Sequence, residues 1–296
     1  MVTMRNTLES VLEPEGASEW VRRALQRLYH WERTWYAPCD SLAEFRNLQR
    51  VAADRLAIGP APGGRPGSAL RVEVRDGDVV PHTGAHWRAE AIGPEEHQGS
   101  GMTKFRWMTL FDAAYPRNPV SAQGQMWQVF FQWHQADDPP DAGSSPPVEF
   151  IIGPGSNGQG RLYLSLNRPD PANPGSSTQV SRHEVADLTP GVWHQFEVEI
   201  SWHLSKGSIR VLHDGVEVVP RMQAQTIFPK RDDLTTPGCT YLKAGLYRRN
   251  LPAKDNGKPV GVPPNVGFVL HHDEIERFER HMRRLPRPWS WVLQRR

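Results

Sequence analysis

The segment YLKAGLYR, residues 241–248, alternates side chains of two kinds. In an extended strand, successive side chains point to opposite faces. One face of such a strand would carry a polar row with a gap in it: Tyr241, Lys243, Gly245 and Tyr247. The other face would be mostly apolar: Leu242, Ala244, Leu246 and Arg248. The segment therefore predicts a strand with a core on one side and a polar surface on the other.

Short apolar runs bounded by Gly, Pro or Asp recur from residue 54 onward, at 56–58, 69–74, 87–92, 105–111, 126–134, 148–152, 162–166, 193–202, 208–213, 216–219 and 267–272. Asp214-Gly215 between two of these runs predicts a tight hairpin, because glycine readily adopts positive φ. Runs of this length and spacing indicate an all-β sandwich. Stretches rich in Pro, Gly, Asn and Ser predict long loops around one rim, at 136–147, 153–160, 168–178 and 251–265.

The chain divides into three parts by its sequence pattern. Residues 1–53 are expected to form a helical N-terminal extension, since Trp31 and Trp35 belong to an apolar face at helical spacing and 41–44 (SLAE) matches a capping box. Residues 54–280 are the predicted β-sandwich. Residues 281–296 are a basic tail, expected to be solvated and anchored by its tryptophans, with a polyanion contact as the alternative.

Composition narrows the function classes. A hydrophobic content of 38% supports a real core, and a net charge of only +2 argues against a general nucleic-acid binder. The first fifteen residues lack the apolar region of a signal peptide, and no run is long enough to span a membrane. We therefore expect no membrane partner and no export by the general route, which leaves the cytoplasm or a non-standard route. Cys39 and Cys239 can form one disulfide or remain two thiols. We expect a monomer.

Three short stretches carry candidate chemistry. Arg88 and Glu90 share one strand face, and so do Gln132 and His134, while Trp133 points the other way. Taken singly, an Arg–Glu pair is most simply a structural ion pair and a strand histidine a structural residue. Together with Lys243 and Tyr247, these side chains match the needs of one reaction.

That reaction is abstraction of the weakly acidic C5 proton of a uronic acid. Hydrogen bonds or positive charge on the sugar carboxylate stabilise the enolate-like intermediate, and Gln132, Arg88 or Lys243 can provide them. A neutral His134 or a phenolate can take the proton, and Tyr247 can protonate the departing glycosidic oxygen. This chemistry requires no cofactor.

Gln132-Trp133-His134 and the 241–247 segment resemble the polysaccharide lyases of the heparin lyase I and glucuronan lyase type. The order Arg-Ala-Glu, Gln-x-His, Tyr-x-Lys-Ala-Gly-x-Tyr is also similar to three motif strands of the jelly-roll alginate lyases. This resemblance covers about residues 54–280 and implies a β-jelly roll that cleaves an anionic, uronate-containing polysaccharide by β-elimination in a groove on a concave sheet. Trp133 replaces a small aliphatic residue of alginate lyases, which favours the heparin and glucuronan branch.

The resemblance also implies roles for the individual residues. Tyr247 would be the catalytic acid, and also the base when the proton and leaving group lie on one side of the sugar; His134 would be the base or its partner, and Gln132 the carboxylate neutraliser. The expected substrate contacts are Arg88, Lys243, Glu90, Tyr241 and Arg248. In the strand that carries them, Gly245 is expected to leave room for a sugar.

Two other functions and two cation sites remain open at this stage. A non-catalytic carbohydrate-binding jelly roll would use the same aromatic residues. A glycoside hydrolase would need two carboxylates in one groove, for which Glu149 with Glu197 or Glu199 are the candidates. No metal is assigned: neighbouring residues of 271–274 (HHDE) point apart, and a Ca²⁺ ion at His134, Asp137 and Asp138 would need six to eight oxygen ligands.

Overall fold

Apolar and polar side chains alternate along the strands of this chain. In β11 (Trp193–Ser201), the side chains of Phe196, Val198 and Ile200 are fully buried, while Glu197 and Glu199 between them point outward into ion pairs. A period of two can bury one face of a strand only if a second layer covers that face. The sequence pattern therefore dictates a sandwich of two sheets.

The structure is a computed structural model, which describes residues 29–75, 77–81, 86–116, 128–135, 145–155, 159–170, 173–230, 233, 235–248, 254–255, 258–259 and 267–282. Within these ranges, no helix has the length and apolar character that crossing a membrane requires. The helical content of the same ranges consists of two single turns of 3-10 helix, Leu42–Glu44 and Ala53–Arg55.

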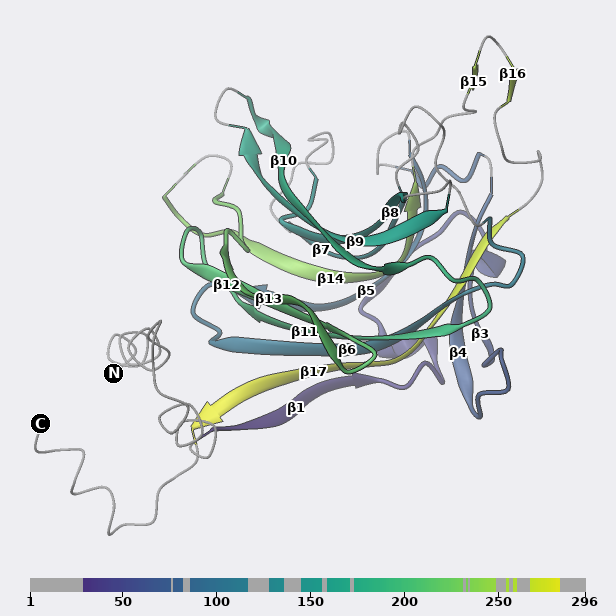
Figure 1. Cartoon of the computed structure of the whole chain (residues 1–296), viewed down its shortest axis with the longest axis horizontal. Coiled ribbons are helices and arrows are strands. Elements are labelled where there is room, and N and C mark those ends of the chain that lie inside the picture. The colour runs from purple at the N-terminus through teal and green to yellow at the C-terminus, as the bar shows by residue number, and fades with distance from the viewer. Residues whose placement is uncertain are drawn as a thin grey trace, which may run out of the picture.

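Two antiparallel sheets face each other (Figure 1). The first has the spatial order β13 (Val216–Ala224), β12 (Gly207–His213), β11, β6 (Met102–Phe111), β17 (Phe268–Met282), β4 (Ser68–Val74), β3 (Leu56–Pro60), with β1 (Tyr29–Ala37) also on β17. The second has the order β10 (Asn173–Asp187), β9 (Gly160–Asp170), β8 (Val148–Pro154), β7 (Gln128–Gln135), β14 (Cys239–Arg248), β5 (Trp87–His97), β2 (Asn47–Gln49). A small pair, β15 (Lys254–Asp255) and β16 (Lys258–Pro259), stands apart. The all-β jelly-roll sandwich is confirmed.

The core lies between the two sheets and is rich in aromatic side chains. Trp107 of β6 stacks on Phe131 of β7, with ring centroids 3.9 Å apart, and on Phe196 of β11 at 4.9 Å. Trp133, which was predicted to point away from Gln132 and His134, is fully buried in this core, where its ring lies against that of Trp107. Each such ring removes a large apolar area from water, so these contacts hold the two sheets together.

One buried ion pair also joins the sheets. Arg277 of β17 donates to both carboxylate oxygens of Glu96 in β5, with Nη2 3.0 Å from Oε2. Glu96 is fully buried, and burial raises its pKa although Arg277 opposes the rise. Arg277 also donates to Thr34 Oγ1 of β1 at 2.6 Å, so a single guanidinium of β17 contacts both β5 and β1.

Two local predictions are confirmed. Asp214 and Gly215 both have positive φ, 49° and 78°, and form the turn between β12 and β13. Ser41 and Glu44 form the predicted capping box, in which each side chain satisfies a backbone donor of the other end of the turn. This box caps a single 3-10 turn rather than a long helix.

The helical extension predicted for residues 1–53 is wrong where the structure describes it. Residues 29–37 are strand β1, paired along its length with β17, and residues 47–49 are strand β2. A spacing of four residues, as between Trp31 and Trp35, suits one face of a helix and also one face of a regular strand, although β1 shifts register between Arg33 and Trp35. In the described residues, strands of the sandwich therefore run from Tyr29 in β1 to Met282 in β17, while residues 1–28 and 283–296 lie outside the described part.

The predicted loop at 168–178 is also wrong, because residues 168–170 end β9 and β10 begins at residue 173. The loop at 153–160 is shorter than predicted, since β8 ends at Pro154 and β9 begins at Gly160. Most of 136–147 and 251–265 lies outside the described residues, but the described part of 251–265 is strand, β15 and β16, so the loop prediction is wrong there. Residues 281–282 of the predicted basic tail belong to β17, and the rest of the tail, with Trp289 and Trp291, lies outside the described residues. Both cysteines are free thiols, and Cys39 is buried.

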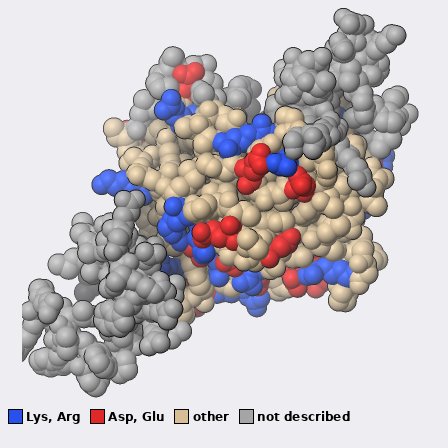
Figure 2. Space-filling view, in the orientation of Figure 1, with Lys and Arg blue, Asp and Glu red and all other residues tan. Residues whose placement is uncertain are grey.

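Charged side chains of both signs are interspersed on the face shown in Figure 2. The ion pairs of β11 to β13 follow the same pattern: Glu199 is paired with Arg210 and Arg221, and Arg210 also with Glu217. Such mixing agrees with the small net charge of the chain and gives this face no broad field of one sign.

Candidate active site

The predicted polar residues lie on three neighbouring strands of the second sheet, with β14 between β5 and β7. The backbone register places Lys243 opposite Gln132 and Tyr241 opposite His134 on β7. On the other side, Tyr247 lies opposite Arg88 of β5. The outer face of this sheet, turned away from the core, therefore carries these polar side chains together. They are called the polar row below: Arg88, Glu90, Gln132, His134, Tyr241, Lys243 and Tyr247. Figure 1 shows that strands β14 and β9 bow so that this outer face is concave.

Glu90 is the centre of a buried polar cluster in the middle of the row. Its carboxylate accepts a hydrogen bond from Gln132 Nε2, and lies 3.4 Å from Lys243 Nζ and 3.6 Å from Arg88 Nη1. The side chains of Glu90 and Lys243 are each only 2% exposed, so the protein surrounds these charges almost completely. The cluster holds two cations for one carboxylate, and its charge favours an incoming anion.

Tyr247 forms one end of the row. The Arg88 guanidinium lies 4.2 Å from the centre of its ring, and Tyr247 also packs against the apolar side chains of Val129, Ile151 and Tyr163. Burial raises the pKa of Tyr247 to about 12, although the charge of Arg88 and a hydrogen bond from it oppose the rise. At neutral pH the phenol is therefore protonated and able to donate.

His134 forms the other end of the row. Its Nδ1 lies 3.0 Å from the backbone oxygen of Gln135, which can only accept, so Nδ1 carries the proton and Nε2 the lone pair. Burial, together with the charges of Lys243 and Arg88, lowers the pKa of His134 to about 3, although the hydrogen bond to the Gln135 backbone opposes the shift. The imidazole is therefore neutral at physiological pH and can accept a proton. Its ring centroid lies 5.8 Å from that of Tyr241.

The structure does not place His134 directly beside Tyr247. Tyr247 pairs with Val129, five residues from His134 along β7, or about 16 Å at about 3.3 Å per residue. Arg88 packs on the Tyr247 ring at one end, and its charge contributes to the lowered pKa of His134 at the other.

A second carboxyl group lies under the same face. Glu149 of β8 is opposite Gln132 in register, is buried, and accepts a hydrogen bond of 3.1 Å from Asn167 Nδ2. Burial raises the pKa of Glu149 to about 7, while hydrogen bonds from Asn167 and Ser165 oppose the rise. Its charge in turn raises the pKa of Tyr247. Glu149 can therefore change its protonation state near neutral pH.

Two expectations for the 241–248 segment need correction. Arg248 is 2% exposed on the core side of β14, where its guanidinium lies 4.0 Å from the Phe268 ring centre and 4.8 Å from that of Trp87. Strand alternation places it there, so it is not a substrate contact. A Cβ atom at Gly245 would overlap the backbone oxygen of Ala89 and lie 2.6 Å from the Glu90 Cα. Glycine is required there by the neighbouring strand, not by a sugar.

The carboxylate pair expected of a hydrolase is not formed. Glu149 lies in the second sheet, whereas Glu197 and Glu199 lie on β11 of the first, in ion pairs with arginines. In residues 271–274, two neighbouring side chains have separate partners: His272 is buried against Thr109 Oγ1 and Asp273 is paired with Arg65. Asp137 and Asp138 lie outside the described residues.

Sequence reasoning missed two residues of the site. Gln49 of β2 accepts a hydrogen bond of 3.1 Å from Lys243, and His86 lies against Tyr247 with ring centroids 5.5 Å apart. Gln49 was hidden by the helical interpretation of residues 1–53. His86 lies two residues before Arg88, the spacing of a shared strand face, and this was the signal that could have revealed it.

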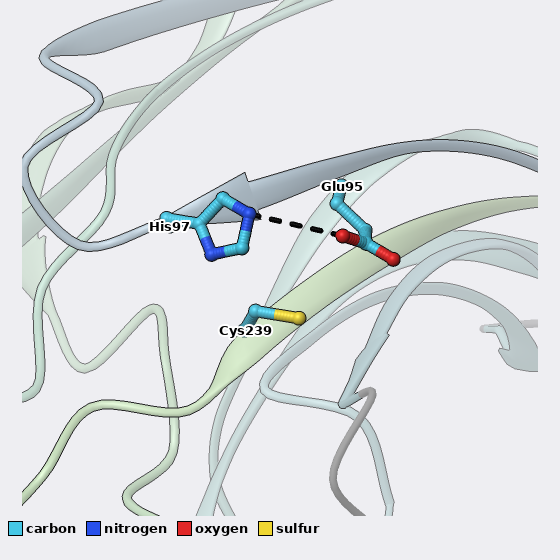
Figure 3. Close-up of side chains that lie close together, drawn as sticks. All are labelled: Glu95, His97 and Cys239. Atoms are coloured by element: carbon cyan, nitrogen blue, oxygen red, sulfur yellow. Dashed lines mark ion pairs between the residues drawn. The ribbon is translucent and has the colours of Figure 1, made fainter.

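A group of metal-capable side chains lies near the Tyr241 end of the row. Figure 3 shows Glu95 and His97 of β5 with Cys239 of β14, and the His97 Nε2 atom is 3.8 Å from Glu95 Oε2. Glu95 also forms an ion pair of 2.7 Å with Arg46, and the side chain of His97 is 59% exposed. The group is therefore open to water and partly neutralised by an arginine.

The sequence profile described as polysaccharide lyase matches residues 42–276, a range that runs from the capped turn before β2 into β17 and includes every residue of the row. The chain belongs to the polysaccharide lyase family. It is accordingly an enzyme, and the alternative of a non-catalytic binding module is set aside. No curated protein matches this lyase at a significant level.

Several solved structures are similar to this lyase. Alginate lyase AlyC3 is 10% identical, with 72% of this chain and 75% of that chain covered at a TM-score of 0.46. The exolytic alginate lyase AlyA5 from Zobellia galactanivorans is 10% identical, with 79% of this chain and 90% of that chain covered at a TM-score of 0.44. The catalytic domain of the glycoside hydrolase family 131 protein from Coprinopsis cinerea is 15% identical, with 81% of this chain and 88% of that chain covered at a TM-score of 0.48.

Proposed function

We propose that this lyase cleaves a uronic-acid-containing polysaccharide by β-elimination on the outer face of the second sheet. The observation that carries the proposal is the buried cluster, in which Arg88 and Lys243 share the single carboxylate of Glu90. A sugar carboxylate placed over these cations would be stabilised most when the C5 proton leaves, because negative charge then moves onto the carboxylate. Gln132, held by Glu90, would present its amide to the same group.

In this mechanism the sugar lies over the Glu90 cluster, between the two ends of the row. His134 removes the C5 proton and Tyr247 protonates the glycosidic oxygen. Because these two residues start about 16 Å apart along the sheet, both side chains turn inward over the cluster to reach one sugar. The protonation states fit, because His134 is neutral and Tyr247 carries its proton at neutral pH. Arg88 lies against the Tyr247 ring and stabilises the phenolate formed when the proton is given up. Electrons of the broken C5–H bond form the C4–C5 double bond as the C4–O bond breaks, so no oxidant or reductant is needed.

The reaction type is tested by incubating the enzyme with a panel of uronate polysaccharides and recording ultraviolet absorbance. Elimination gives an unsaturated sugar that absorbs, whereas hydrolysis gives new reducing ends without absorbance. Reducing ends without absorbance on every active substrate would exclude elimination. Running the panel with and without a chelator tests, in the same experiment, the expectation that catalysis needs no metal.

The donor is tested by a matched pair of variants on one strand face. Tyr247→Phe is expected to lower kcat by about 10²- to 10⁴-fold, the contribution of one general acid. Tyr241→Phe should stay within about tenfold of the wild type, because Tyr241 is assigned only to substrate contact. Full loss in Tyr241→Phe with activity kept in Tyr247→Phe would transfer the donor role to the phenol beside His134. Circular dichroism would check that both variants fold.

A further inference from the structure

Two histidines and an aspartate meet at one end of the first sheet, on the opposite layer from the polar row. His194 is near the start of β11, His213 ends β12, and Asp214 begins the turn into β13. Their ligand atoms all lie within 4.8 Å of one another. None of the three takes part in the proposed elimination, so the group needs an explanation of its own.

The distances match those of ligands that share one small cation. His194 Nδ1 lies 3.0 Å from His213 Nε2, and His213 Nε2 lies 3.4 Å from Asp214 Oδ2. Around a tetrahedral zinc ion with bonds of about 2.0–2.1 Å, ligand atoms are about 3.3 Å apart. Both observed separations lie close to that value, so a cation could enter with little movement of the side chains.

The surroundings hold the three groups in place. His194 is 4% exposed, and its ring lies 5.9 Å from that of Phe111, while the His213 ring lies 5.3 Å from that of Phe196. Asp214 Oδ1 accepts a hydrogen bond of 2.8 Å from the backbone of Gln195, which turns Oδ2 toward His213. Such an outer hydrogen bond is the usual means by which a ligating carboxylate is oriented.

The protonation states favour ligation. Burial lowers the pKa of His194 to about 4, and burial also lowers the pKa of His213. Both rings are therefore neutral at physiological pH, and neutral imidazole is the form that binds metals. In the 3.0 Å hydrogen bond between the two rings, one facing nitrogen carries the proton. Binding of a cation moves that proton to the other nitrogen of the same ring, so each neutral ring still holds one proton.

We propose that His194, His213 and Asp214 bind a divalent transition-metal ion, with Zn²⁺ as the best fit, and that the ion fastens the β12–β13 turn to β11. Two nitrogens and one carboxylate oxygen suit Zn²⁺ better than Ca²⁺ or Mg²⁺, which prefer oxygen ligands alone. A fourth position would face water, since the Asp214 side chain is 53% exposed. The ion stabilises the sandwich and is not part of the elimination. The metal-site proposal is therefore tested independently of the proposed lyase chemistry.

The probe is Co²⁺, titrated into the full-length protein after dialysis against a chelator. One Co²⁺ per chain is expected, with the visible bands of a low-coordinate site and without the near-ultraviolet band of a cobalt–thiolate bond. Zn²⁺ should displace Co²⁺ and, at about a hundredfold excess over its Kd, raise Tm by about 5 °C. Lyase activity should be the same with and without the ion.

Variants separate this site from the group in Figure 3. His213→Gln and Asp214→Asn should each weaken Co²⁺ binding at least tenfold, whereas Cys239→Ser should leave it unchanged. Asn tolerates positive φ and still accepts from Gln195, so Asp214→Asn tests the site even if His213→Gln does not fold. A thiolate band lost in Cys239→Ser, unchanged binding in Asp214→Asn, or no Co²⁺ uptake by the wild type would each overturn the proposal.

Discussion

A single side chain, Glu149, shows how burial can set chemistry in this lyase. It is buried beneath the polar row, which disfavours its charged form. Among the described residues, hydrogen bonds from Asn167 and Ser165 and the charge of Arg182 favour the charged form and partly offset this effect. Its pKa of about 7 lies above that of the unfolded chain, near 4.5. A raised carboxyl pKa contributes stability below about pH 4.5, and this contribution is lost as the pH rises through about 7.

Glu149→Gln should therefore change the pH dependence of stability. The variant keeps the size of the side chain and cannot ionise, so it avoids the cost of a buried charge above pH 7. We expect its free energy of unfolding, relative to the wild type, to rise between pH 5 and pH 8 by up to about 3 kcal/mol. Urea denaturation at the two pH values measures this difference. An equal difference at both pH values would show that Glu149 does not titrate in this range.

Residue roles were only partly predictable from the sequence. Alternation along 241–248, 130–134 and 87–90 correctly placed Lys243, Gln132, His134 and Arg88 on one surface, because a strand leaves two possible faces only. Alternation also placed Arg248 on the core face, and its assignment as a substrate contact rested on its charge alone. A guanidinium can be buried when aromatic rings and hydrogen bonds surround it, and that environment exists only in the folded chain.

At the scale of elements, β14 is held closely by β5 at one position. Gly245→Ala would push a methyl group into the backbone of Ala89 and Glu90, so the two strands must separate locally. We expect a loss of about 1–3 kcal/mol in the free energy of unfolding, and lower activity because Glu90 moves with its backbone. The matched control is Gly59→Ala in β3, where an added Cβ meets nothing within 4 Å. Equal stability of the two variants would contradict the prediction.

The strands themselves were predicted well where apolar runs are bounded by turn residues. They were predicted poorly in β1, where the spacing of apolar residues also suits a helix, and at the start of β10, where the composition is typical of turns. Strand β1 carries tryptophans at a spacing that suits helix and strand alike, and only its pairing with β17 decides between them. Strand β10 begins in the Asn-Pro-Gly-Ser-Ser stretch at 173–177, a composition typical of turns. Its pairing with β9 contains three register shifts, and such irregular pairing leaves no clean period to detect.

At the scale of the whole molecule, the ion pair between Arg277 and Glu96 crosses the sandwich. Arg277→Met would leave the fully buried Glu96 without its cation, at an expected cost of about 3–5 kcal/mol. The double variant with Glu96→Gln should recover part of that loss, because the buried charge is removed as well. Thermal unfolding of the two variants and the wild type measures both effects. A double variant no more stable than Arg277→Met would show that the cost lies in lost packing instead.

Strand β17 has a consequence for how the protein is made. It pairs with β4 through its first half, with β1 through its second half and with β6 along most of its length, and its partners in β1 precede it by more than two hundred residues. Until residues 268–282 have left the ribosome, those three strands have no neighbour on that side. Long-range pairing of this kind folds slowly and exposes strand edges meanwhile. Synthesis halted before residue 268 should therefore yield an aggregation-prone chain rather than a smaller enzyme.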